Sequence, residues 1–328
     1  MKKAYFALAC LILLAGLSAP AQAAYTFKMG HSQATDHAFH GIVEHFVNVV
    51  KEKSNGEIDI VIFASSQLGD EQTMMDSLKM GTLDFLMANA SNVASHVPEM
   101  GLISCCFLFN DKEHIARVSA DPAVFERYSD IITKKKLGFT LLSMMGNGAR
   151  HLYTIDPVKS LDDIAKKKIR IMPSAIDNKM WAALGAVPTT VAFNEVYTAL
   201  QTHMVDGAEN TFSSYYASKH FEVAGNLALT EHQWLMVQFW VSNKTLAKLP
   251  DNLRAVLFEA AAETAPWALE YQNKVDENFR KELEASGKVT IHAIDRAPLQ
   301  ERIAPLQDQI AKDLGTEDIL ARIRELAS

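Results

Sequence analysis

The feature that most constrains the fold of this chain is a regular alternation of strand-like and helix-like apolar patterns. Side chains that alternate in polarity indicate a strand, and apolar residues spaced three and four apart indicate a helix. The first segments follow the order strand, helix, strand, helix, strand: Tyr25 to Gly30, Phe39 to Val50, Ile58 to Phe63, Asp70 to Met80 and Asp84 to Ala88. This order predicts an α/β fold with a parallel sheet covered by helices on both faces.

A second unit of the same kind begins near Arg150. Ser160 and Asp163 have the spacing of a capping box, which predicts a short helix at this point. The segments that follow are a strand, two helices and a strand: Ile169 to Met172, Ser174 to Leu184, Phe193 to His203 and Val205 to Glu209. Two domains are expected, because a mature chain of roughly 305 residues exceeds one ordinary core.

A strand-like segment and a long helix follow the second unit. Leu235 to Ser242 has the pattern of a strand, and helical spacing then continues from Asp251 to about Ala285. This helix is far longer than the usual three turns, and Pro266 lies inside it. Because proline removes a backbone donor and clashes with the preceding turn, we expect the helix to bend near Ala265.

The N-terminus has the pattern of a secretory signal peptide. Lys2 and Lys3 precede an apolar run, and Ala21 to Ala23 form a small-residue cleavage site, so cleavage after Ala23 is expected. Without these two lysines the 32 basic side chains become 30 against 39 acidic ones, and the formal charge of −7 becomes −9. We therefore expect an exported protein that does not bind nucleic acid.

Cysteine and histidine give no sign of a disulfide framework or a metal site. The cysteines outside the signal segment, Cys105 and Cys106, lie in an apolar run, and adjacent cysteines rarely form a disulfide because the ring is strained. Two buried free thiols are expected. The eleven histidines show neither an HExxH pattern nor a zinc-finger spacing. No metal and no cofactor are predicted.

One arginine stands inside an apolar strand. Arg170 belongs to the segment KIRIMPSA, and burying an unpaired guanidinium costs several kcal/mol as a rough figure. An anionic partner is therefore expected, and a carboxylate suits the forked donor geometry of arginine. The alternative is an internal salt bridge with Asp206 or Glu209. In open α/β sheets ligands bind beyond the carboxyl ends of the strands, which places this site in a cleft.

The order and spacing of several motifs resemble a known family. The motifs are MGHSQATDHAFHGIVEHFVNVVKEKSNGEIDI, SSQLGDEQTMMDSLKMGTLDFLMANAS, CCFLFNDKEH, GNGARHLYT, KIRIMPSA, LGAVPTTVAFNEVYTALQTHMVDGAEN and LALTEH. In this order the chain resembles the DctP-like solute receptors of tripartite ATP-independent periplasmic (TRAP) transporters. The resemblance implies a two-domain periplasmic binding protein fold, with a cleft between the domains and a long kinked helix touching both. It further implies one domain of residues 24–147 plus 236–275, and another of residues 148–235 plus 276–328.

The resemblance also implies which residues bind the ligand. The family's arginine that clasps a carboxylate matches Arg170, and Arg150 matches one that reaches the same anion; the alternative for Arg150 is a surface or hinge position. Asn210 suits a hydroxylated ligand, and Phe193 matches an aromatic residue beside the ligand. Asn89 stands where sialic acid receptors carry a glutamate, which weakens a sialic acid assignment. The remaining candidates at strand ends or helix starts are His31, Ser32, His37, Glu71 and Trp234.

The function expected from the resemblance is capture of a small organic acid in the cleft and its delivery to TRAP membrane permease subunits. A uronate or related sugar acid is favoured, a C4-dicarboxylate is the alternative, and a sensory binding protein for a membrane kinase would share the same fold and site. We expect a monomer. An enzyme is not expected, because the sequence holds no GxSxG nucleophile motif and no plausible catalytic cysteine. The chain also lacks a phosphate-binding GxxxxGK[ST] loop.

Overall fold

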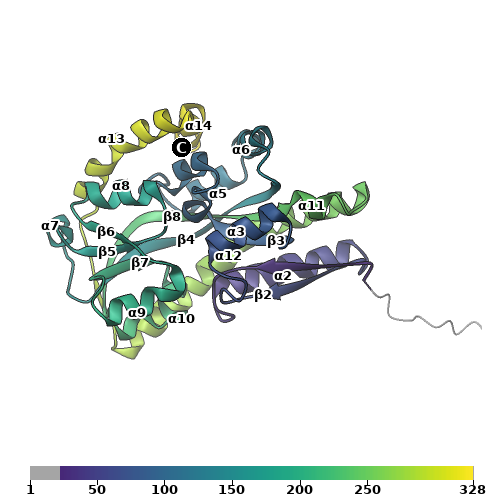
Figure 1. Cartoon of the computed structure of the whole chain (residues 1–328). Coiled ribbons are helices and arrows are strands. Elements are labelled where there is room, and N and C mark those ends of the chain that lie inside the picture. Colours follow the sequence, from purple (N-terminus) through teal and green to yellow (C-terminus); the bar gives the residue numbers. More distant parts are fainter. Residues whose placement is uncertain (1–22, 328) are drawn as a thin grey trace, which may run out of the picture.

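The computed structural model describes residues 23–327. The expected signal peptide lies almost wholly outside these residues. Within them the strands join in one mixed sheet, shown in Figure 1. The strands are β1 (Tyr25–Gly30), β2 (Ile58–Phe63), β3 (Phe85–Asn89), β4 (Phe139–Thr154), β5 (Lys168–Ile171), β6 (Val187–Thr190), β7 (Gly207–Asn210), β8 (Asn226–Ser242) and β9 (Thr290–His292).

The sheet has the order β2-β1-β3-β8-β4-β7-β5-β6, and β9 pairs with β8. Strands β1, β2 and β3 are parallel at one end, and β5, β6 and β7 are parallel at the other. The prediction of a parallel sheet is wrong for the centre, where β8 is antiparallel to both β3 and β4, and β4 is antiparallel to β7. The two long strands β4 and β8 thus join the halves of the sheet, which we name the β1–β3 half and the β5–β7 half.

Helices cover both faces of this sheet (Figure 1). They are α2 (Ala38–Lys53), α3 (Glu71–Met80), α4 (Ala90–Val93), α5 (Lys112–Ser119), α6 (Pro122–Lys135), α7 (Leu161–Ile164), α8 (Ala175–Ala183), α9 (Val196–Gln201), α10 (Phe212–Ala217), α11 (Asn243–Leu246), α12 (Asp251–Ser286), α13 (Ala297–Leu314) and α14 (Glu317–Glu325). Short 3₁₀ turns are η1 (Pro98–Ser104), η2 (Phe193–Glu195) and η3 (His220–Glu222). No helix of the described part is both long and apolar enough to cross a membrane.

The long helix α12 confirms the predicted extent, and Pro266 lies inside it. It contacts α2, β4 and α10, so it touches elements of both halves of the sheet. In Figure 1 it runs behind the sheet toward α9 and α10. The bend expected near Ala265 stays a prediction.

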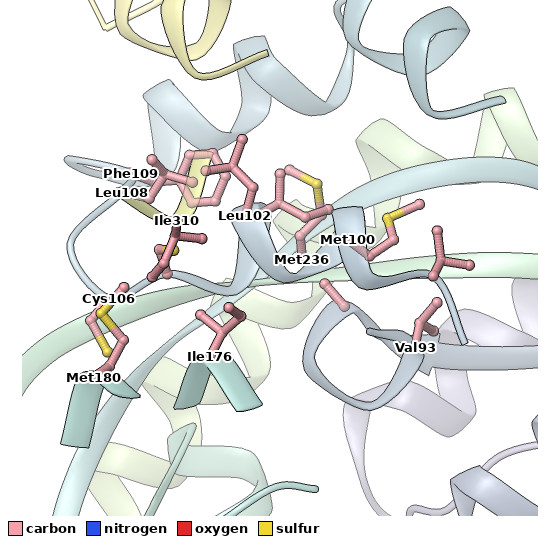
Figure 2. Close-up of a cluster of buried hydrophobic side chains, with 14 of the residues drawn as sticks. Val93, Met100, Leu102, Cys106, Leu108, Phe109, Ile176, Met180, Met236 and Ile310 are labelled. Carbon is pink, nitrogen blue, oxygen red and sulfur yellow. The ribbon is translucent and has the colours of Figure 1, made fainter. Parts of the chain in front are cut away.

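Cys105 and Cys106 are buried free thiols, as predicted. They belong to the largest hydrophobic cluster, which joins η1, α8, α13 and β8. Figure 2 shows its side chains Met100, Cys106, Ile176, Met180 and Ile310 gathered between these elements. Helix α13 therefore anchors the C-terminal part of the chain to both halves of the sheet.

Candidate functional site

A small cavity lies where strands end and helices begin. Side chains in its wall come from the carboxyl ends of β3, β5 and β7 and from the N-termini of α2, α3, α4 and α10. Helix N-termini carry partial positive charge, so this arrangement favours an anion. Seven of the predicted site residues line the cavity: His37, Glu71, Asn89, Arg150, Arg170, Phe193 and Asn210.

Arg170 is buried between β6 and β7 with 2% of its surface exposed. Its Nε donates to the carbonyl oxygen of Val191 at 2.9 Å. No carboxylate of the described residues lies within 4 Å of its guanidinium, so the two predicted alternatives for a salt bridge are wrong. Asp206 instead accepts from the Lys168 backbone, at 2.7 Å. Burial lowers the pKa of Arg170, and its terminal amino groups have no hydrogen-bond partner among the described residues.

Arg150, in contrast, already has an anionic partner. Its guanidinium forms an ion pair with both carboxylate oxygens of Glu209, and both side chains are 2% exposed. His232 lies 3.2 Å from the same carboxylate. Burial alone raises the pKa of Glu209, but the charge of Arg150 and the bond from His232 together lower it to about 2. The Arg150 charge is therefore neutralised within the protein.

Arg150 also sets the orientation of Asn210. Its Nη1 donates to Asn210 Oδ1 at 2.8 Å, and the backbone N–H of Thr211 donates to the same oxygen at 2.9 Å. Because both bonds use the oxygen, the amide nitrogen of Asn210 is the atom left to donate to a ligand. This places a neutral donor in the cavity wall beside the charge of Arg170.

Glu71 is the centre of a polar network in the wall of the cavity. Ser32 Oγ donates to Glu71 Oε1 at 2.5 Å, and the amide nitrogens of Asn92 and Asn89 donate to Oε2 at 2.6 and 3.2 Å. Burial raises the pKa of Glu71, although these hydrogen bonds and the charge of Arg170 oppose the shift. Asn89 Oδ1 also caps α4 by accepting from the Asn92 backbone.

His37 connects the two sides of the cavity. Its Nδ1 accepts from the Phe39 backbone at 2.9 Å and caps α2, so its proton lies on Nε2. Nε2 donates to Ser214 Oγ of α10, at 2.8 Å. Burial, helped by the neighbouring His31, lowers the pKa of His37 to about 3, so the ring is neutral at pH 7.

Three predicted residues lie elsewhere. Ser32 lines a neighbouring, larger cavity, which shares Glu71, Asn92, Arg170 and Phe193 with the first. His31 lines neither cavity, and its Nε2 lies 3.0 Å from His40 Nδ1. Trp234 also lines neither cavity, because it packs against the largest hydrophobic cluster.

Several residues of the wall were not predicted. The polar ones are Gln33, Asn92, Asn147, Thr211 and Ser214. Four of them follow a predicted strand by two to five residues, and this position in the sequence is the signal that could have identified them. Asn147 has no such signal, because it lies inside β4 next to the bulge between Gly146 and Ala149. Within residues 23–327 no group of three or more His, Cys, Asp or Glu is placed to hold a metal ion.

Comparison with known proteins assigns the chain to a family. The profile of the family described as "Bacterial extracellular solute-binding protein, family 7" (DctP) matches residues 29–313. A solute-binding protein of Sulfitobacter sp. (strain NAS-14.1) is 31% identical over 312 residues, which cover 94% of this chain and 93% of the relative.

Solved structures show the same fold. A TRAP periplasmic solute-binding protein from Xanthobacter autotrophicus Py2, with bound β-D-galacturonate, has a TM-score of 0.86 at 29% identity, covering 91% of this chain and 99% of its own. One from Sulfurospirillum deleyianum DSM 6946, with bound succinate, has a TM-score of 0.85 at 30% identity, covering 93% and 100%.

These similarities confirm the expected fold class, a mixed α/β version of the two-domain periplasmic binding protein fold. They extend along nearly the whole described chain and include every element that forms the cavity. The chain therefore belongs to the bacterial extracellular solute-binding protein family 7, the DctP family, and its structural relatives are TRAP periplasmic solute-binding proteins.

Proposed function

We propose that this chain is a periplasmic receptor that holds the carboxylate of a small sugar acid, such as a uronate, on Arg170 and delivers the acid to a TRAP membrane permease. The observation that carries this proposal is the buried guanidinium of Arg170, which faces a cavity and has no carboxylate partner among residues 23–327. The bound galacturonate of the Xanthobacter relative supports a uronate. The protein acts by binding and not by catalysis.

The proposed export signal is residues 1–23, with cleavage after Ala23. The proposed domains are residues 24–147 plus 236–275 and residues 148–235 plus 276–328. The irregular register of β4 and β8 between Gly146 and Ala149 supports a boundary at this point, because bulges bend strands. A C4-dicarboxylate remains the second candidate ligand, since the Sulfurospirillum relative holds succinate.

The test is a thermal-shift screen of organic acids followed by calorimetry, with the mature protein. A ligand that binds only the folded protein raises its melting temperature by mass action. We expect D-galacturonate or a related uronate to raise it, and Arg170→Ala to abolish the shift while leaving the unliganded protein folded. Arg324→Ala, which removes an exposed arginine paired with Asp308, is the matched control and should bind normally. Retained binding by Arg170→Ala would refute the proposal.

A further inference from the structure

The hydrogen bonds around Glu71 run from neighbouring side chains toward its carboxylate. A carboxylate accepts hydrogen bonds only, so the amide groups of Asn89 and Asn92 must turn their nitrogens toward it. Ser32 Oγ uses its hydrogen on Glu71, and it therefore accepts from Gln33 Nε2 at 3.3 Å. The donors of Ser32, Asn89 and Asn92 thus point to Glu71, and the donor of Gln33 points to Ser32.

The acceptor oxygens of the same side chains are consequently turned away from Glu71. Asn92 Oδ1 and Gln33 Oε1 are buried and have no hydrogen-bond partner, and both residues line the cavity. Each of these side chains is 7% exposed. A buried acceptor without a partner is costly, so these oxygens favour a ligand that brings donors to replace the water that would otherwise satisfy them. Hydroxyl groups supply donors, and an ionised carboxylate does not.

The charges in the wall lead to the same conclusion. The charge of Arg150 is neutralised by Glu209, so among the described residues of the wall Arg170 is the cation left for one ligand carboxylate. A second carboxylate would meet the negative charge of Glu71 and two oxygen acceptors. Like charges repel strongly where burial limits screening by solvent.

We propose that Glu71 makes this cavity selective for monocarboxylic acids whose other polar groups are hydroxyls, and that it rejects dicarboxylic acids of the same size. This inference rests on the proposed function and assigns the ligand class of the same site. Glu71 selects both directly, through its charge, and indirectly, by fixing the orientation of Asn92 and Gln33.

The test compares D-galacturonate with galactarate, in which the aldehyde carbon C1 is oxidised to a second carboxylate. Galactonate, an open-chain acid with the same six carbons and one carboxylate, is the control for loss of the sugar ring. Calorimetry at pH 7.5 should show galacturonate binding to the unaltered protein at least about tenfold more tightly than galactarate, since tenfold corresponds to one modest charge interaction. In Glu71→Gln this preference should fall at least about tenfold. Glutamine can still accept from the two asparagines and donate to Ser32, so the network is retained.

Asp76→Asn is the matched control, because it removes the same charge from the exposed face of the same helix. Its preference should equal that of the unaltered protein. A second variant covers the case in which Glu71→Gln does not fold: Asn92→Ala should weaken galacturonate binding about tenfold, while acetate binding stays unchanged.

Each outcome decides between the two hypotheses. An unchanged galacturonate preference in Glu71→Gln, or equal binding of both acids by the unaltered protein, overturns the selectivity inference while leaving the Arg170 site intact. If no acid binds the unaltered protein, or if Arg170→Ala binds normally, the proposed function itself fails.

Discussion

Glu209 and Arg150 form a buried ion pair in which each side chain depends on the other. Removing one partner from such a pair strands the other charge in the interior, at a cost of about 3–5 kcal/mol. We therefore expect Glu209→Ala to lower the free energy of unfolding by this amount, measured by urea denaturation. Each side chain of the pair is 2% exposed, so water cannot solvate the charge of Arg150 when Glu209 is removed.

Two controls accompany this prediction. The double variant Arg150→Met/Glu209→Leu should recover most of the loss, because it removes both charges of the pair. Asp308→Ala breaks an exposed ion pair with Arg324 and should cost no more than about 1 kcal/mol. An equal decrease in the free energy of unfolding for Glu209→Ala and Asp308→Ala would show that the buried pair stabilises the protein no more than the exposed pair does.

The buried carboxyl of Asp177 is expected to make the free energy of unfolding depend on pH. Its carboxyl is buried, accepts from Ser91 Oγ at 3.2 Å and has one oxygen without a partner. Burial and the charge of Glu209 raise its pKa from 3.8 to about 7. The folded protein thus binds this proton more tightly than the unfolded chain, and the contribution of Asp177 to stability falls as pH rises from about 4 to about 7.

Asp177→Asn should remove this dependence, because an amide does not ionise. At pH 8 we expect the variant to be more stable than the unaltered protein by roughly 2–4 kcal/mol, and at pH 4 the two should be similar. Melting temperatures across this pH range provide the measurement. A variant less stable at pH 8 would show that the ionised carboxyl is tolerated.

At the scale of elements, β4 passes α12 at Gly148 with no space for a side chain. A Cβ at Gly148 would lie 2.0 Å from Asp276 Oδ2, and Asp276 also accepts from the Ser213 backbone at 2.7 Å. Gly148→Ala should therefore displace the Asp276 carboxylate from its bond to Ser213 and cost about 1–3 kcal/mol, as overpacking usually does. Gly146→Ala is the matched control, because its Cβ would meet only side-chain carbons at 3.2–3.3 Å. Similar melting temperatures for both variants would contradict this reading of the crossing.

The sequence predicts elements well where local signals mark both ends. Asp70 caps α3 and Gly81 ends it in the left-handed conformation, and both residues are visible as start and stop signals. The segment from Phe193 to His203, expected as one helix, is a 3₁₀ turn followed by α9. The strand expected at Leu235 begins nine residues earlier, at Asn226. Its first part lies at the β5–β7 end of the sheet and is recognised only from its pairing with β4.

The same limit applies to the site. Arg170 is recognisable because a charge interrupts an apolar strand, and Glu71 and His37 because they stand at helix starts. The pairing of Arg150 with Glu209 is not recognisable, because it joins β4 to β7 across 59 residues of sequence. Local pattern identifies candidate side chains, whereas only the fold shows which of them already satisfy one another.

At the scale of the whole molecule, side-chain hydrogen bonds join the two halves of the sheet. His37, before α2, donates to Ser214 of α10, and Ser91 of α4 donates to Asp177 of α8. Helices α2 and α4 adjoin the β1–β3 half, whereas α8 and α10 adjoin the β5–β7 half. Contacts of this kind exist only when the halves are close together, so they stabilise a closed arrangement relative to an open one.

We predict that removing both hydroxyls, in Ser91→Ala/Ser214→Ala, weakens acid binding about tenfold. The reason is that the closed arrangement alone loses two hydrogen bonds, each worth about 1 kcal/mol, and an affinity is reduced by the fraction of molecules able to close. Small-angle X-ray scattering should show a smaller radius of gyration when ligand is added to the unaltered protein. Ser218→Ala, at the end of α10, is the control and should bind normally. Unchanged affinity in the double variant, or a radius of gyration unaffected by ligand, would indicate that binding does not depend on closure.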